Sequence, residues 1–253
     1  MNRRDALRHL IAGTGAMAAG GRTIPRPGPR ARRGDGRLHA RIRTPNQAAA
    51  PGLQPLGLGG ARDGLFYVPA GYRREKAAPL ALLLHGAGQE AAELITPMKT
   101  LADDTGLVLL APDSRDVTWD VIHGDYGADI RFIDLALTWA FERVRTDPAR
   151  VSLAGFSDGA SYALSIGRIN GDLFRRIAAF SPGFVAAGEP AGHPRIFITH
   201  GTQDRILPID GASRRIVPAL KAQGYEVEYH EFTGPHAVNL PLLKVAAAWL
   251  AAR

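Results

Sequence analysis

The sequence predicts an α/β fold, in which helices cover both faces of a mostly parallel central sheet. Strand-like and helix-like segments alternate from residue 64 to the C-terminus, which is typical of βαβ units. Several strand-like segments are continuous apolar runs, such as PLALLL and LVLLA, as in strands buried on both faces. The chain has 253 residues, 45% of them hydrophobic, which is enough to bury a full core.

The first half of this region supplies three strands and one helix. The run LFYV predicts a short strand over residues 65–68. PLALLL ends in His-Gly and LVLLA ends in Pro-Asp, so they predict buried strands over 79–84 and 107–111 that stop at turn residues. Ile130, Ile133 and Leu137 recur at helical spacing and predict a helix over 129–144.

The second half continues the alternation. VSLAGF predicts a strand over 151–156 that runs into a helix over 157–169. Strands are predicted over 177–180 and 196–199, and a helix between 206 and 224, where Gly224 stops it. The alternating VEYHEF predicts a last strand over 227–232, and residues 240–252 a terminal helix. No internal repeat interrupts this region.

The basic character of the chain is confined to its beginning. The net charge is +7, but residues 1–50 hold eleven arginines against Asp5 and Asp35, a net of +9. The remaining residues hold twenty Lys and Arg against twenty-two Asp and Glu, a net of −2. Nucleic-acid binding is therefore not expected of the body, and an arginine-mediated contact would be confined to the first fifty residues.

The N-terminal region is predicted to contain an export signal followed by a linker to the folded domain. Residues 1–20 combine Arg3 and Arg4, a short apolar run and an Ala-x-Ala site, which indicates a twin-arginine-type signal peptide and export to the periplasm or medium. An ordinary basic tail of a cytoplasmic protein is the alternative. Residues 21–60, rich in Arg, Pro, Gly and Ala, predict a disordered linker. The folded domain is expected over 61–253, without a membrane span.

One pentapeptide carries a chemical signal. Gly155-Phe156-Ser157-Asp158-Gly159 is a G-x-S-x-G between a predicted strand and a predicted helix. That context favours a nucleophile elbow, in which a sharp turn exposes the serine hydroxyl above the sheet. The alternative is a serine that caps the following helix.

A base and an acid follow in the order that such a fold uses, serine, then acid, then histidine. Asp204 comes after the strand at 196–199, and His236 after the strand at 227–232, so both lie in loops at carboxyl strand ends. Asp210 and Asp172 are rival acids, but Asp210 leads into a helix and Asp172 lies at the opposite end of the sheet.

Two backbone N–H groups are candidates for an oxyanion hole. Asp158 follows the serine, and Ala87 lies in the glycine-rich turn after the strand at 79–84. The same turn matches a relaxed G-x-G-x-x-A dinucleotide pattern, but no phosphate-binding P-loop is present. Neither a metal nor a cofactor is expected, because H-E-x-x-H and cysteine are both absent. His85 and His200, each before a glycine, are interpreted as loop histidines bonded to the backbone.

The motifs LLLHGAG, VSLAGFSDGA, HGTQD and GPH resemble the α/β-hydrolase superfamily. They are most similar to serine esterases of the phospholipase/carboxylesterase and polyhydroxybutyrate-depolymerase-like groups, from residue 64 to the C-terminus. The resemblance implies a catalytic triad of Ser157, Asp204 and His236, with oxyanion donors at Ala87 and Asp158. It implies cleavage of a small-molecule carboxylic ester through an acyl-enzyme. The depolymerase pattern differs in having cysteines and an appended substrate-binding domain.

The substrate pocket is predicted from two loops. Residues 113–127 include Trp119 and His123, and Phe184 lies opposite, so these three side chains are candidate walls; the alternative places Trp119 and Phe184 in the core. Residues 181–194 are too few to form a helical lid. A peptidase, a polyester or feruloyl esterase and a non-catalytic binding protein are the alternative functions. A binding protein of this fold is disfavoured, because it usually lacks a triad member.

Overall fold

The structure is a computed structural model that describes residues 34–253. Its centre is one sheet in the order β1-β2-β4-β3-β5-β6-β7-β8. The first two strands pair antiparallel, and β2 also pairs antiparallel with β4, while every other pairing is parallel. The strands are β1 (Gly52–Pro55), β2 (Gly64–Val68), β3 (Ala78–Leu84), β4 (Val108–Pro112), β5 (Thr146–Phe156), β6 (Arg176–Phe180), β7 (Arg195–Gly201) and β8 (Val227–Phe232).

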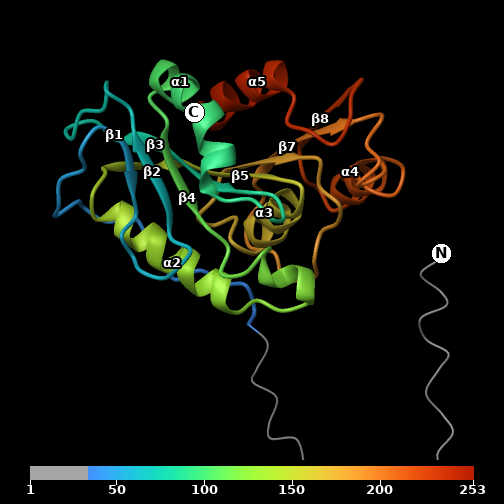
Figure 1. The fold of residues 1–253 in the computed structure, drawn as a ribbon, viewed down its shortest axis with the longest axis horizontal. Coiled ribbons are helices and arrows are strands. Elements are labelled where there is room, and N and C mark those ends of the chain that lie inside the picture. Colours follow the sequence, from blue (N-terminus) through green and yellow to red (C-terminus); the bar gives the residue numbers. More distant parts are fainter. Residues whose placement is uncertain (1–33) are drawn as a thin grey trace, which may run out of the picture. The chain divides into compact units, whose positions relative to one another are not determined.

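The helices form two layers around this sheet (Figure 1). One face is covered by α1 (Ala91–Thr105) and α5 (Leu240–Ala251), which pack against each other. The other face carries α2 (Ala128–Phe141), α3 (Asp158–Ile169) and α4 (Ser213–Ala222). The central strands are apolar on both faces because each layer buries one of them. The predicted α/β class and its strands are thus confirmed.

Helix α1 was not predicted from the sequence. Its buried Ala91, Leu94, Ile95 and Met98 follow helical spacing, but Pro97 lies between them in the helix interior. Proline removes one backbone donor there, which weakens the sequence signal for a helix. The fold accepts this loss because the apolar face of α1 packs on the sheet and on α5.

The linker predicted over residues 21–60 is wrong from residue 34 onward. Leu38 and Leu56 are buried in the core, and β1 extends the sheet. The buried side chain of Asn170 holds the segment, since it accepts from the N–H of Leu38 and donates to the carbonyl of Gly36, both at 2.8 Å. A few well-placed apolar residues order a segment whose average composition suggests disorder. The predicted signal peptide and the first part of the linker lie outside the described residues.

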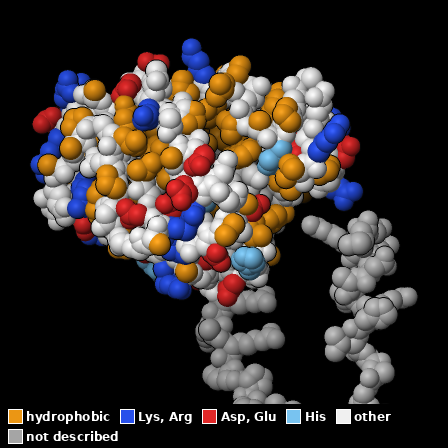
Figure 2. All heavy atoms as spheres, viewed as in Figure 1, with side chains coloured by type: hydrophobic (Ala, Val, Ile, Leu, Met, Phe, Trp, Pro, Cys, Tyr) orange, Lys and Arg blue, Asp and Glu red, His pale blue; other side chains and the backbone are white. Residues whose placement is uncertain are grey.

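The surface of the domain mixes both signs of charge. Figure 2 shows blue and red side chains interspersed over the face in view, with apolar side chains gathered in its upper middle. Among the described residues no helix is long and apolar enough to cross a membrane.

Candidate active site

The serine of the G-x-S-x-G motif lies in a strained turn between β5 and α3. Ser157 has φ 56° and ψ −119°, and it is one of two described non-glycine residues with positive φ. A Cβ on Gly155 would lie 2.2 Å from the carbonyl oxygen of Gly159. A Cβ on Gly159 would lie 2.2 Å from the carbonyl oxygen of Leu84. Both glycines are required because the turn brings backbone against backbone.

The structure brings the predicted serine, histidine and aspartate together. Nε2 of His236 lies 2.8 Å from Oγ of Ser157, and Nδ1 of His236 lies 2.5 Å from Oδ2 of Asp204. The side chain of Asp204 is fully buried, and that of His236 is 13% exposed. The rival acids lie elsewhere: Asp172 pairs with Arg37 and Arg41, and Asp210 pairs with Arg214.

The aspartate is held in its charged form. Burial alone would raise the pKa of Asp204, but hydrogen bonds from His236 and from the N–H groups of Leu207 and Ile206 lower it below its usual value. Those two N–H groups donate to Oδ1 at 2.8 and 2.9 Å, which leaves Oδ2 for His236. The arrangement fixes the carboxylate and gives the imidazole a permanent negative partner.

The two predicted oxyanion donors flank the serine. A Cβ on Gly86 would lie 3.4 Å from Cβ of Ser157, so the turn that carries Ala87 touches the nucleophile elbow. The N–H groups of Ala87 and Asp158 donate to no other described backbone group outside the regular helices and strands. The side chain of Asp158 instead accepts from the hydroxyl of Thr118 at 2.7 Å, which ties the loop after β4 to α3. Neither N–H group is taken up by a loop or turn of the described residues, as the predicted role in an oxyanion hole requires.

The loop after β4 differs from the prediction at Trp119. Trp119 is completely buried, donates its indole N–H to the carbonyl of His85 at 2.8 Å, and stacks on Tyr162. The prediction that Trp119 lines the substrate pocket is therefore wrong, and its role is to support the turn after β3. His123 is exposed at the end of the short helix η1 (Asp120–His123), and its role in substrate binding stays a prediction.

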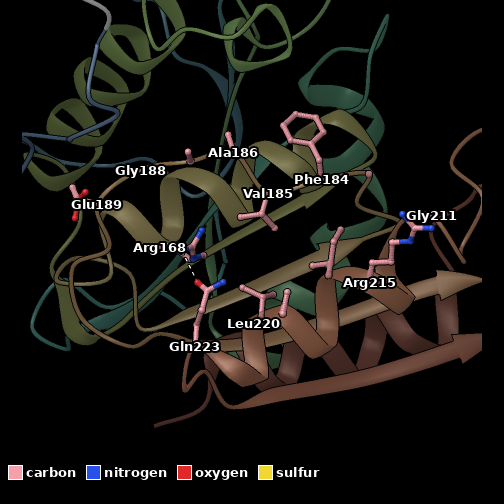
Figure 3. A pocket seen from close by; sticks show the side chains of 14 residues that line it. Arg168, Phe184, Val185, Ala186, Gly188, Glu189, Gly211, Arg215, Leu220 and Gln223 are labelled. Carbon is pink, nitrogen blue, oxygen red and sulfur yellow. Dashed lines mark hydrogen bonds between the residues drawn. The ribbon is translucent and has the colours of Figure 1, made fainter.

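Two hollows lie near the predicted site residues. A cavity of about 930 Å³ is lined by residues 202–206 with Pro235 and His236. Phe184, 36% exposed, lines a groove of about 650 Å³ between residues 183–189 and α4. Figure 3 shows Phe184 at one end of this groove and the hydrogen bond between Arg168 and Gln223 near the other. Residues 181–194 contain no helix, in agreement with the expectation that they are too few to form a helical lid.

A second histidine at the site, His200, was not predicted from the sequence to contact Asp204. His85 matches its interpretation, since Nδ1 bonds the carbonyl of Gly86 and Nε2 accepts from the N–H of Ser114. His200 also bonds the backbone, but its Nε2 lies 3.1 Å from Oδ2 of Asp204 as well. The HGTQD motif places these residues four apart, which was the available signal. Among the described residues, no group of three or more His, Asp or Glu could hold a metal ion.

No family model matches the chain. A curated protein of Nocardia uniformis subsp. tsuyamanensis, named "Putative esterase NocK", is 29% identical over 146 residues. That match spans 53% of this chain and 42% of the relative, so the chain matches less than half the length of this relative.

Solved structures of esterases and serine hydrolases share the fold. Esterase PE8 is 25% identical, with a TM-score of 0.60 over 74% of this chain and 96% of that one. The fluorophosphonate-binding serine hydrolase FphF of Staphylococcus aureus has a TM-score of 0.63 at 13% identity, over 81% and 100% of the two chains. A ferulic acid esterase of Anaeromyces mucronatus has a TM-score of 0.54 at 20% identity, over 75% and 82%. The predicted resemblance to the α/β-hydrolase fold is thereby confirmed.

Proposed function

We propose that this α/β-hydrolase chain is a carboxylic ester hydrolase that works through an acyl-enzyme on Ser157. The observation that carries the proposal is the continuous hydrogen-bonded line from Oγ of Ser157 through His236 to Asp204, at 2.8 and 2.5 Å. Such a line is what nucleophilic catalysis by serine requires. The ester class is supported by the relatives, which include proteins named as esterases.

The proposed reaction begins when Oγ of Ser157 attacks the ester carbonyl carbon. Nε2 of His236 takes the hydroxyl proton, and Asp204 stabilises the imidazolium through Nδ1–H. His236 then gives the proton to the departing alkoxide, which leaves the acyl group on Ser157. A water molecule, deprotonated by His236 in the same way, then attacks the acyl-enzyme, and His236 returns that proton to Oγ of Ser157 as the acid leaves.

The N–H groups of Ala87 and Asp158 are assigned as the hydrogen-bond donors to the negatively charged oxygen of the tetrahedral intermediate. The two groups come from the two sides of the elbow, which Gly86 and Gly159 allow to approach closely. Donors fixed in place before the reaction stabilise the developing oxyanion without a cost of reorganisation. Loss of one such donor typically lowers kcat about 10²- to 10³-fold.

An open site with apolar surroundings favours uncharged esters. Val117 is 64% exposed and its carbonyl accepts from the N–H of Gly88, beside the oxyanion turn. Ile206 is 70% exposed and lines the cavity that His236 also lines. Exposed apolar side chains next to a reactive group favour apolar substrate parts, because contact with them removes both surfaces from water. Short acyl and feruloyl esters are therefore the first substrates to test.

The test is hydrolysis of a panel of p-nitrophenyl acyl esters, feruloyl esters and hydroxybutyrate oligomers by the full chain and by Ser157→Ala. We expect release of the alcohol by the wild type and a loss of at least about 10³-fold in Ser157→Ala. Ser152→Ala is the matched control, because Ser152 is a buried serine on β5, the strand that precedes the elbow. Full activity of folded Ser157→Ala would exclude the proposed mechanism.

A further inference from the structure

A buried histidine that the proposed reaction does not use lies against the aspartate. The side chains of His200, at the end of β7, and Asp204 are both fully buried. Nε2 of His200 lies 2.9 Å from the carbonyl oxygen of Leu207, its directed hydrogen-bond acceptor. Oδ2 of Asp204, the oxygen that binds His236, lies 3.1 Å from the same nitrogen and is in close contact with the ring.

These contacts fix which ring nitrogen of His200 carries the proton. A carbonyl and a carboxylate oxygen both face Nε2, and neither can donate, so Nε2 must be protonated. Nδ1 lies 2.7 Å from Oγ of Ser213, which can donate its hydroxyl proton to it. Burial lowers the pKa of His200, so the ring is neutral at pH 7.

The ring also holds the turn that orients the carboxylate. Leu207 accepts from His200 through its carbonyl, and it donates its N–H to Oδ1 of Asp204 at 2.8 Å. His200 therefore acts on one carboxylate oxygen through this turn and lies beside the other directly. The titratable groups near the ring are Asp204, His236 and, from β8, Glu231, which is paired with Arg214 of α4.

We propose that His200 is a positioning residue for the reaction, a neutral Nε2–H donor that holds Asp204 in the rotamer that binds His236. This inference rests on the proposed function of Ser157, Asp204 and His236. The hydrogen bond from Nε2–H to the carbonyl of Leu207 fixes the turn whose N–H binds Oδ1 of Asp204. Loss of His200 frees this turn, so Oδ2 of Asp204 is no longer held where it meets Nδ1 of His236.

The test compares two substitutions of His200 with one control. His200→Leu removes the donor at similar volume, and we expect kcat to fall about tenfold to a hundredfold. KM should change by less than about twofold, because His200 does not line the cavity that His236 lines. His200→Gln keeps an N–H donor and should retain most of kcat. His230→Leu, at a half-buried position on β8, is the control that should change neither kcat nor KM.

A kcat calculated per titrated active site distinguishes a positioning role of His200 from a purely structural one. Active sites are counted by titration with a phosphonylating reagent, so a fraction that fails to fold does not lower kcat. A purely structural role would give His200→Leu a lower Tm with the wild-type kcat, and that result would overturn the proposal.

A second measurement does not depend on activity. Nitrogen-15 NMR of the imidazoles in the wild-type chain should show His200 at pH 7 protonated at Nε2 and bare at Nδ1. The opposite tautomer, or a cationic ring, would overturn the proposal even if His200→Leu cannot be produced in folded form. If the wild type hydrolyses no ester, the proposed function fails, whereas the NMR result still decides the state of His200.

Discussion

Replacement of Gly159 by alanine tests the close approach on which the site depends. Its Cβ would lie 2.2 Å from the carbonyl oxygen of Leu84 and 2.3 Å from that of His85, whereas real Cβ contacts are essentially never shorter than 3.0 Å. The end of β3 and the start of α3 must therefore separate by about 0.8 Å, since the nearest obstacles are backbone atoms. Overpacking of this kind costs about 1 to 3 kcal/mol of unfolding free energy.

The same separation moves the two proposed oxyanion donors apart, because Ala87 follows β3 and Asp158 begins α3. We expect kcat for a p-nitrophenyl ester to fall about a hundredfold or more, as for loss of one donor. Gly71→Ala is the matched control, since a Cβ there meets nothing within 4 Å, and its unfolding free energy should change by less than about 0.5 kcal/mol. A kcat for folded Gly159→Ala within twofold of the wild type would refute this account of the elbow.

Two further predictions concern stability. Burial lowers the pKa of His85 and His200 from 6.5, so below about pH 6.5 the unfolded chain binds protons that the folded chain does not. The free energy of unfolding measured with urea should therefore be highest above pH 6.5. Below pH 6.5 it should fall by up to about 1.4 kcal/mol per histidine and pH unit. An equal free energy of unfolding at pH 7.5 and 5.5 would contradict this sign. Asn170→Ala leaves the buried N–H of Leu38 without its partner and should cost about 2 kcal/mol. A protease should then cut the Asn170→Ala variant near residues 34–40 faster than the wild type. The control variant Asn46→Ala, changed at an exposed position, should be cut no faster than the wild type.

The sheet could be predicted because its strands are local patterns. PLALLL and VSLAGF are apolar runs bounded by turn residues, and the strands β3 and β5 contain them. Helix α1 was missed although Leu94, Ile95 and Met98 have helical spacing, since Pro97 weakens the pattern and tertiary packing outweighs the loss. Residues 34–60 were missed because a segment held by Asn170 and a few buried leucines does not differ in composition from a linker.

The candidate site could be predicted as far as chain order and strand ends determine it. Ser157, Asp204 and His236 each follow a strand whose carboxyl end lies at the same edge of the sheet, so their meeting follows from topology. The burial of Trp119 and the contact of His200 with Asp204 depend on which way side chains turn in the packed loops. For Trp119 no pattern of residue types gave that direction, and for His200 the only signal was its four-residue spacing to Asp204.

Covalent labelling of the chain shows directly whether Ser157 is the nucleophile. The full chain is treated with a p-nitrophenyl phosphonate, which serine hydrolases attack as they attack an ester, and the digested protein is analysed by mass spectrometry. We expect one phosphonyl group, on the peptide that contains Ser157. In His236→Ala the labelling should be at least about a hundredfold slower. A label on any other serine, or unchanged labelling in His236→Ala, would contradict it.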